Sequence, residues 1–455
     1  MPQSPDHISH SDHFDHSDHS DPAHRIGPTD STDSTDSTDS TDSTEPTTPT
    51  TPTTPTEPTA PAEPRYFPEP RGACPFAPAP AYERAREEEP VSRVPLRDGS
   101  RPWMVTRHAD VRTVLTDRRF GADARRAGFP FPFAARAFVL QGEPPFVRMD
   151  GEEHAAQRRM VTRHFTARRT EELRPRIQEI TDRVLDELVA AGPDADLVRD
   201  FALPVPSLVI CHLLGVPYAQ HAFFQERSRA LVDHTATPEQ TAEGWRELVE
   251  YLERLAQDKL REPDDSIVSD LVNKEWLEPA KAAAMARVLL VGGHETSANM
   301  AALAVLALLR HPDQLALLQE RPELLPGAVG ELLRYVTVVG DPGLPRVAVE
   351  DATVGGQPIR AGEGVLCMLP VANRDPEVFP AGATLDVTAD ARGHLAFGAG
   401  PHQCLGRPLA QLELEIMIGS LFRRLPGLRL AVPFEDLRYR ERALIHGPLE
   451  LPVRW

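Results

Sequence analysis

The sequence predicts a mainly α-helical fold with small β-sheets. The clearest helix is expected from Pro279 to Arg310, because proline suits the first turn of a helix and His311-Pro312 ends one. A helix of that length would span about 48 Å at 1.5 Å per residue, enough to cross a whole domain. A second helix is expected to begin at Cys404, because apolar residues recur from there at helical spacing. They are Leu405, Leu409, Leu412 and Ile416.

The other elements are shorter. Trp103–Thr106 predicts a strand, followed by a helix that holds Val111, Val114 and Leu115. Residues 121–146 are rich in glycine, proline and phenylalanine, which predicts a long loop with apolar side chains. Towards the carboxyl end we expect three further elements. They are a hairpin turn at Val354–Gln357, a strand over Gly364–Pro370 and a last hairpin over Gly447–Val453.

Residues 1–64 differ in composition from the rest of the chain. They carry thirteen acidic residues and one base, Arg25, and so hold 12 of the 19 excess negative charges. Residues 29–64 are a Ser-Thr-Asp repeat followed by a Thr-Pro repeat, which cannot bury enough apolar surface to offset the entropy of ordering. We expect a disordered, low-complexity acidic tail over 1–64. Its histidines could bind a divalent metal weakly, although a solvated tail is the simpler interpretation.

The remaining composition favours a soluble cytoplasmic protein. The four cysteines are scattered without the spacing of disulfide pairs or zinc sites, which is typical of a reducing compartment. No basic and apolar leader opens the chain, and the longest apolar run, Met300–Leu309, is too short to span a bilayer. We expect no membrane partner. We also expect no nucleic-acid partner, because the net charge is strongly negative and no nucleic-acid-recognition motif is present.

The chemistry is organised around the stretch Phe397–Gly406. Glycines and a proline precede a single cysteine, Cys404, just where a helical pattern starts. Orphan backbone N–H groups and the positive end of the helix dipole would stabilise a thiolate there, and such a thiolate can ligate iron. The glycines would let a flat cofactor approach the backbone. A buried structural cysteine after a glycine turn is the alternative.

This stretch resembles the haem-thiolate signature of the cytochromes P450, with Phe397, Gly398, Gly400, His402, Cys404 and Gly406 at its fixed positions. The resemblance implies a cytochrome P450 fold over residues 65–455, in one large helical domain, although that length alone would suggest two or more domains. It further implies that haem b (iron protoporphyrin IX) is the cofactor and that Cys404 is the metal ligand. Phe397 would shield the sulfur, and Gly398 and Gly406 would line the cofactor.

Further residues match positions that hold the haem in this family. His154 and Arg158 lie four apart, so they project from one helix face and suit an anionic carboxylate such as a haem propionate. Taken alone, such a pair is more often solvated surface. Arg346 and His394 match the family residues that reach a propionate from a strand and from just before the cysteine loop.

The middle of the long helix carries Gly292-Gly293-His294-Glu295-Thr296. Each interior glycine costs about 1 kcal/mol relative to alanine, so a functional use is plausible. The stretch resembles the family's oxygen-activation motif, with Gly292 where alanine is usual. This implies catalytic roles for Thr296, which would order water and donate a hydrogen bond, and for Glu295, which would help supply protons. The alternative is structural: the two glycines would allow close helix packing, and the threonine hydroxyl would be capped within the helix.

Glu331 and Arg334 lie three apart on a predicted helix and match the family's internal ion-pair network. That network normally takes another arginine from the segment before the haem loop. Ala389 stands at this position, so either Arg392 substitutes or the network lacks a member.

The resemblance implies a monooxygenase that activates O2 and hydroxylates or epoxidises an apolar small molecule, with closest similarity to actinobacterial enzymes of secondary metabolism or xenobiotic oxidation. A polyketide or macrolide would be the substrate. Electrons would come from a ferredoxin and its NAD(P)H-dependent reductase, steered by the basic residues 158–169, to a monomeric enzyme. The loop 121–146, a lid after residue 201 and the tip of the last hairpin would enclose the substrate. Oxidative coupling or dehydration without oxygen insertion, and a non-catalytic haem-binding module, are the alternatives.

Overall fold

The computed structural model describes residues 67–132, 145–217, 220, 223, 226–227, 238–339, 343–440 and 444–455. Contacts divide the chain into Met1–Ala62 and Glu63–Trp455, and the described residues belong to the second unit. The predicted disordered tail therefore lies outside the described residues, and the predicted boundary at residue 65 stays a prediction. Phe133 and Phe138 of the predicted loop 121–146 also lie outside them, as do most of residues 218–237 in the predicted lid.

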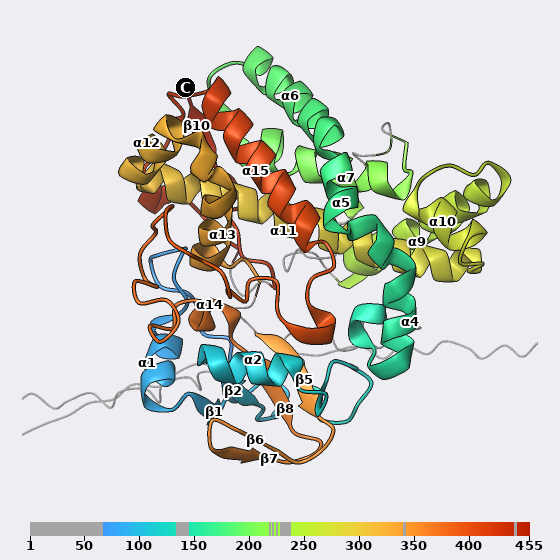
Figure 1. The fold of residues 1–455 in the computed structure, drawn as a ribbon, viewed down its shortest axis with the longest axis vertical. Coiled ribbons are helices and arrows are strands. Elements are labelled where there is room, and N and C mark those ends of the chain that lie inside the picture. The colour runs from blue at the N-terminus through green and yellow to red at the C-terminus, as the bar shows by residue number, and fades with distance from the viewer. Residues whose placement is uncertain are drawn as a thin grey trace, which may run out of the picture. The chain divides into compact units, whose positions relative to one another are not determined.

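The second unit is mainly helical with small sheets, as predicted (Figure 1). The described helices up to residue 214 are α1 (Pro80–Glu88), α2 (His108–Thr116), η1 (Phe146–Arg148), α4 (Gly151–Thr162), η2 (Arg163–Phe165), α5 (Ala167–Glu172), α6 (Arg174–Ala191), η3 (Val198–Ala202) and α7 (Pro204–Leu214). Those that follow are α9 (Pro238–Arg261), α10 (Ile267–Asn273), α11 (Pro279–Arg310), α12 (Pro312–Glu320), η5 (Pro322–Leu324), α13 (Leu325–Val336), α14 (Leu369–Ala372), η6 (Gly400–His402), α15 (Arg407–Arg424) and η7 (Phe434–Asp436).

The strands form three sheets. The largest has the order β1-β2-β8-β5-β3 and is antiparallel except where β2 runs parallel to β8. Its strands are β1 (Val91–Arg93), β2 (Trp103–Val105), β8 (Gly364–Cys367), β5 (Leu344–Ala348) and β3 (Phe120–Gly121). The smaller sheets consist of β4 (Ala195–Asp196), β10 (Pro452–Arg454) and β9 (Arg429–Leu430), and of β6 (Ala352–Val354) and β7 (Gln357–Ile359).

Several predicted elements are confirmed and others are shifted. The turn between β6 and β7 is formed by Gly355 and Gly356, both at positive φ, where glycine carries no steric cost. The strand predicted to reach Pro370 stops at Cys367, because Leu369-Pro370 opens the short helix α14. The predicted last hairpin begins earlier than expected, since Tyr439 pairs with Pro448 and β10 joins a different sheet.

Helix α11 is the central element of the fold. It starts at Pro279 and ends at Arg310, as predicted, and it runs unbroken through the glycine pair. It packs against α7, α9, α13 and α15, and residues on every side of it are buried, which explains its apolar composition. In the part of the chain that the structure describes, no single helix is long and apolar enough to cross a membrane. Only α11 and α12 taken together reach that length and composition, and they are bent by 102°.

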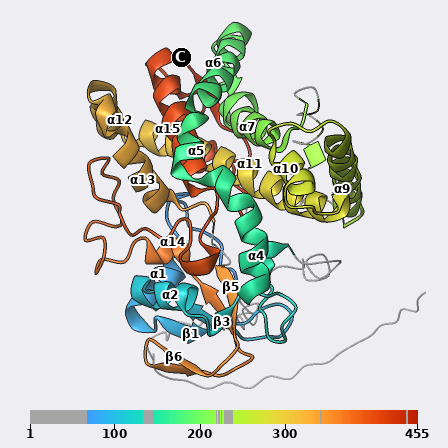
Figure 2. The same ribbon diagram turned by 45° about the vertical axis from the view of Figure 1, so that its right-hand side comes forward.

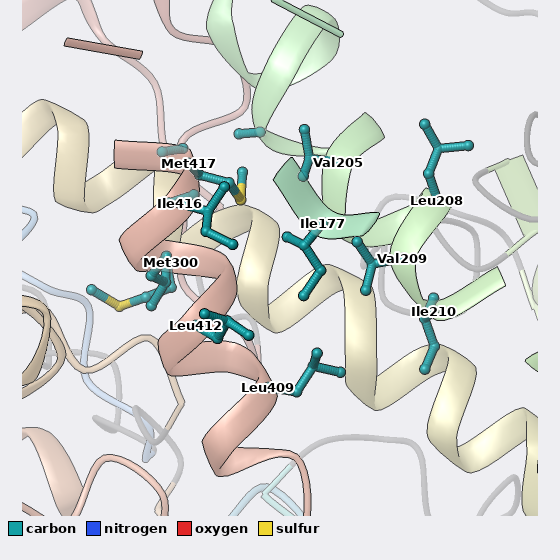
Figure 3. Packing of buried hydrophobic residues seen from close by; sticks show 14 of the residues in the cluster. Ile177, Val205, Leu208, Val209, Ile210, Met300, Leu409, Leu412, Ile416 and Met417 are labelled. Carbon is teal, nitrogen blue, oxygen red and sulfur yellow. The ribbon is translucent and has the colours of Figure 1, made fainter. Parts of the chain in front are cut away.

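The main hydrophobic core joins α11 to its neighbours. Figure 3 shows Leu409, Leu412, Ile416 and Met417 of α15 in one cluster with Ile177 of α6 and Val205, Val209 and Ile210 of α7. The apolar face predicted after residue 404 is thus the face of α15 that packs on the core. A second cluster lies around the five-stranded sheet and α2, and the sheet is drawn at the far end from α6 and α15 (Figure 2).

Candidate active site

Cys404 lies in a tight loop that is closed by its own backbone. The N–H of Cys404 donates to the carbonyl of Phe397 at 2.9 Å. Gly398 and Gly400 both have positive φ, 66° and 71°, a conformation that favours glycine. A Cβ at Gly400 would overlap the carbonyl oxygen of Leu115 in α2, so the loop is pressed against that helix.

The sulfur of Cys404 receives two backbone hydrogen bonds, from the N–H groups of Gly406 and Arg407. The helix begins at Arg407 rather than at Cys404 as predicted, because the residues between them form a turn. The side chain of Cys404 is accessible to solvent, although protein atoms surround most of it. The thiol is therefore open on one side. Burial raises the pKa of this thiol above its ordinary value, and the two N–H groups together with Arg158 and Arg407 oppose that rise. The start of the helix therefore favours the thiolate, as the sequence suggests, and burial opposes it.

His154 and Arg158 lie on α4, as predicted. Arg158 donates to the carbonyl of Gln403 at 2.7 Å and is close enough to Cys404 to favour its thiolate. His154 is buried, and its ring stacks on that of His402 with 4.1 Å between centroids. Burial first, then His402 and Arg158, lower the pKa of His154 to about 4, so this imidazole is neutral at pH 7. Its Nε2 atom is buried without a hydrogen-bond partner.

Strand β5 carries Arg346 into the same region. Arg346 is buried, and Nη1 of its side chain donates to the carbonyl of the preceding residue, Pro345, at 2.8 Å. Arg148, which the sequence analysis did not select, lies beside it. Burial first, and then the nearby charge of Arg346, lower the pKa of Arg148 to about 10. Arg346 is buried and Arg148 is half-buried, and two like charges held close together in this way are costly without an anion between them. Arg148 lies two residues before Asp150, in the stretch that precedes α4. That position in the sequence could have marked it as a candidate site residue.

His394 and Phe397 lie on the approach to the cysteine loop. Their rings are 5.8 Å apart, and the guanidinium of Arg407 lies 5.9 Å from the centre of the Phe397 ring. Burial, with smaller contributions from Arg407 and Arg334, lowers the pKa of His394 to about 4. Gly406 has φ of −79°, and a Cβ added there would meet no protein atom within 4 Å. Packing within the protein therefore does not require glycine at this position.

Thr296 and Glu295 are placed by the middle turns of α11. Gly293 packs against Ile210 of α7, and a Cβ there would lie 3.0 Å from that side chain. Close helix packing thus explains this glycine. Gly292 faces open space instead, and its carbonyl accepts a hydrogen bond from the Thr296 hydroxyl at 2.7 Å. Thr296 is half-buried, and its hydroxyl bonds within its own regular helix.

Glu295 is completely buried, unlike its neighbour Thr296. Its Oε2 atom accepts a hydrogen bond from Nη1 of Arg440 at 3.1 Å, and its Oε1 atom has no hydrogen-bond partner. Sequence reasoning missed Arg440, which lies 145 positions away and carries no local signal.

Another buried carboxyl, also missed, lies where α15 packs on α11. Burial raises the pKa of Glu413 to about 8, and the facing hydroxyl of Ser297, next to Thr296, opposes part of that rise. Glu413 is therefore largely protonated at pH 7. Glu413 lies four residues after Leu409, on the apolar face of the predicted helix, and this spacing could have predicted that it is buried.

The predicted ion-pair network exists around α13. Arg334 makes two hydrogen bonds to Glu331, at 2.6 and 2.7 Å, and both side chains are buried. The remaining N–H groups of Arg334 donate to backbone carbonyls, of Asn373, Gly382 and Thr384. Arg392 does not replace the arginine absent at Ala389. It is 91% exposed and pairs with Asp390.

The fold and these groups define a protein with a cluster of buried cationic and donor groups beside the loop that carries Cys404. Residues 92–426 match the family model for cytochrome P450. The chain is 55% identical over 382 residues to cytochrome P450-SU2 of Streptomyces griseolus, covering 84% of this chain and 94% of that protein.

Solved structures agree with the sequence match. Cytochrome P450 MoxA from Nonomuraea recticatena is 46% identical with a TM-score of 0.81, over 86% of this chain and 98% of that one. The mycinamicin VIII C21 methyl hydroxylase of Micromonospora griseorubida, bound to mycinamicin VIII, is 40% identical with a TM-score of 0.79. The match covers 86% of this chain and 100% of that one. The chain belongs to the cytochrome P450 family. It is therefore an oxidoreductase of the monooxygenase type, and its cofactor is haem b.

The residues present fit haem b. Its propionates need buried donors and cations, and the site offers Arg148, Arg346 and the unpartnered Nε2 of His154. His402 adds a buried Nδ1 atom that also lacks a partner. The open space beside Gly406 leaves room for a flat ring close to the backbone.

Proposed function

We propose that Cys404 is the residue that would bind the haem iron. The observation that carries this proposal is the pair of N–H groups, from Gly406 and Arg407, that point at a sulfur open on one side. Haem held by a thiolate supplies the chemistry that cleaves O2 and transfers one of its oxygen atoms. The two N–H groups would draw charge from the sulfur and so tune the reduction potential.

The proposed propionate contacts are Arg346, His154 and Arg158, with Arg148 added by the structure. His154 would donate from Nε2 as a neutral imidazole, since its pKa lies near 4. His394 belongs to the same proposal because it lies beside Phe397, whose ring would shield the sulfur. Gly398 and Gly406 would keep side chains out of the space for the ring.

Thr296 and Glu295 are the proposed catalytic residues. The Thr296 hydroxyl is held by the carbonyl of Gly292 and can order a water molecule through its oxygen lone pairs. Glu295 would pass a proton through its Oε1 atom, the carboxylate oxygen that has no partner. Each proton that Glu295 passes on would be replaced by one from solvent, so the residue itself is unchanged over a cycle.

The proposed reaction is hydroxylation or epoxidation of an apolar small molecule, such as a macrolide or another polyketide-type secondary metabolite. The similarity to the mycinamicin hydroxylase, which covers the whole of that enzyme and 86% of this chain, supports that substrate class. Phe129 and Phe131, whose rings lie 5.2 Å apart, belong to the predicted loop 121–146. Oxidative coupling or dehydration would leave no added oxygen in the product.

Electrons would come from a ferredoxin and an NAD(P)H-dependent ferredoxin reductase, in the cytoplasm, to a monomeric enzyme. The basic segment 158–169 is less available than its sequence implies. Arg163 pairs with Asp270 and Glu275, and Glu172 pairs with both Arg168 and Arg169. Exposed Arg159 is the residue of this segment best placed to meet an acidic donor.

Product analysis tests this function. The holoenzyme is supplied with NADPH, a ferredoxin and its reductase, mycinamicin VIII as the first probe and 18O2. We expect a product heavier by one oxygen atom that carries the label. A product that has lost hydrogen without gaining oxygen would replace the proposal with coupling or dehydration. If mycinamicin VIII does not shift the Soret band, a panel of apolar macrolides and terpenoids is screened by that shift first.

A further inference from the structure

The ion pair between Glu295 and Arg440 joins the middle of α11 to the carboxyl-terminal segment. The two side chains approach to 3.1 Å, the glutamate is fully buried and the arginine side chain is 16% exposed. A buried carboxylate that has lost its cation is strongly unfavourable, so Arg440 compensates a charge that α11 alone leaves uncompensated.

The segment that carries Arg440 is anchored against the same turns of α11. The N–H of Arg440 donates to the carbonyl of Gly447 at 2.9 Å. Gly447 lies so close to Asn299 that a Cβ on it would overlap the Asn299 amide. Asn299 in turn donates to the backbone carbonyl of Glu295 at 2.7 Å and lies 3.4 Å from its Oε2 atom.

These contacts make the two carboxylate oxygens of Glu295 unequal. Oε2 faces Arg440 and Asn299, whereas Oε1 makes no hydrogen bond and has Nε2 of His294 3.7 Å away. The contacts of Arg440 and Asn299 with Oε2 therefore fix the rotation of the carboxylate group, and the fixed rotation leaves Oε1 without a hydrogen bond.

We propose that Arg440 is a positioning residue for the proton-transfer step. It holds Oε2 of Glu295 towards the carboxyl-terminal segment, so that Oε1 is always the oxygen that accepts and passes on a proton. The inference rests on the proposed function of Glu295. It adds that the carboxyl-terminal segment, and not α11 alone, sets the geometry of the acid.

The test compares Arg440→Gln and Arg440→Lys with the matched control Arg438→Gln. Arg438 lies two residues earlier and pairs with Glu450 at the surface. Each purified holoenzyme is supplied with NADPH, a ferredoxin and its reductase, without substrate. Under these conditions O2, two electrons and two protons give hydrogen peroxide, and the rate is measured in H2O and in D2O. The carbon-monoxide difference spectrum and the melting temperature are recorded for every variant.

We expect Arg440→Gln to slow oxygen reduction about 10-fold and to raise the solvent isotope effect, with the carbon-monoxide band unchanged. Arg440→Lys should recover part of the rate, because it keeps the charge and loses the planar guanidinium that holds Oε2 in place. Arg438→Gln should match the wild type. The melting temperature should fall in Arg440→Gln and recover in Glu295→Gln/Arg440→Gln, which removes both charges.

Equal rates in Arg440→Gln and Arg438→Gln would overturn the inference, as would a slow Arg440→Gln with an unchanged isotope effect. If Arg440→Gln does not fold, Arg440→Lys carries the test. A lowered rate with a raised isotope effect then supports the inference, and a wild-type rate overturns it. Glu295→Gln separates the two proposals. If it slows oxygen reduction and the Arg440 variants do not, only the inference fails, whereas a wild-type rate in Glu295→Gln removes the role of Glu295 and the inference with it.

Discussion

The imidazole rings of His154 and His402 stack at 4.1 Å with 24° between their planes, although 248 positions separate them in the chain. His154 comes from α4 and His402 from the loop that carries Cys404. Asp150, just before α4, adds a second link, since its Oδ1 atom lies 3.5 Å from Nε2 of His402. Helix α4 and the cysteine loop are therefore held together at the point where each presents an unpartnered ring nitrogen, Nε2 of His154 and Nδ1 of His402.

Replacing His154 by phenylalanine should separate stacking from hydrogen bonding. A phenyl ring can keep the contact with His402, but it cannot donate to a propionate. A hydrogen bond to a charged group contributes roughly 1.5 to 3 kcal/mol, so His154→Phe should release haem about 10-fold more readily or more. Transfer of haem to apomyoglobin measures this rate. Retention equal to that of the wild type would exclude His154 as a propionate ligand.

Two glycines of the cysteine loop should respond to alanine in opposite ways. At Gly400 the positive φ and the neighbouring Leu115 carbonyl both oppose a Cβ, so Gly400→Ala should displace the loop and lower stability by more than about 1 kcal/mol. At Gly406 neither obstacle exists, so Gly406→Ala should fold normally and show an altered Soret band. Thermal melting and absorption spectra check both variants, and an unchanged spectrum in Gly406→Ala would place the haem elsewhere.

The ion pair of α13 predicts a contrast in stability. Glu331→Gln leaves the buried guanidinium of Arg334 without its counter-charge, which should cost about 3 to 5 kcal/mol of unfolding free energy. Arg392→Ala removes an exposed arginine and should leave the melting temperature unchanged. Denaturant unfolding with haem bound measures both. A large loss in Arg392→Ala would show that this arginine does belong to the network.

Glu413 predicts how stability varies with pH. Its pKa of about 8 in the folded protein exceeds the ordinary value of 4.5, so the folded state holds a proton that the unfolded state has lost. Stability should therefore fall as pH rises from about 4.5 to 8, by roughly 3 kcal/mol at pH 7 from this group alone. Glu413→Gln should flatten that slope, measured as melting temperature against pH. An identical slope in the two proteins would contradict the protonated state.

Local signals in the sequence account for the predictions that were confirmed. Pro279 and His311-Pro312 delimit α11, because proline acts within one turn of its own position. The start of α15 was predicted three residues too early, since Leu405 continues the apolar spacing although it lies in the turn before Arg407. Apolar periodicity identifies a helix face more reliably than a helix end.

Contacts between distant segments account for what the sequence could not reveal. The pairing of Arg440 with Glu295 depends on a carboxyl-terminal segment folding back onto α11, and no spacing along the chain encodes that distance. Arg148 is similar, since its significance comes from Arg346 in a strand about 200 positions later. The pKa of the Cys404 thiol shows a third limit, because a sequence displays the helix start that favours a thiolate and not the burial that opposes it.

The carbon-monoxide difference spectrum of Cys404→Ser tests the central claim most directly. The matched control is Cys74→Ser, which replaces another exposed cysteine. We expect the band for which the family is named in the wild type and in Cys74→Ser, and its complete loss in Cys404→Ser. An unchanged band in Cys404→Ser would show that another residue binds the iron, and the proposed site would then be wrong.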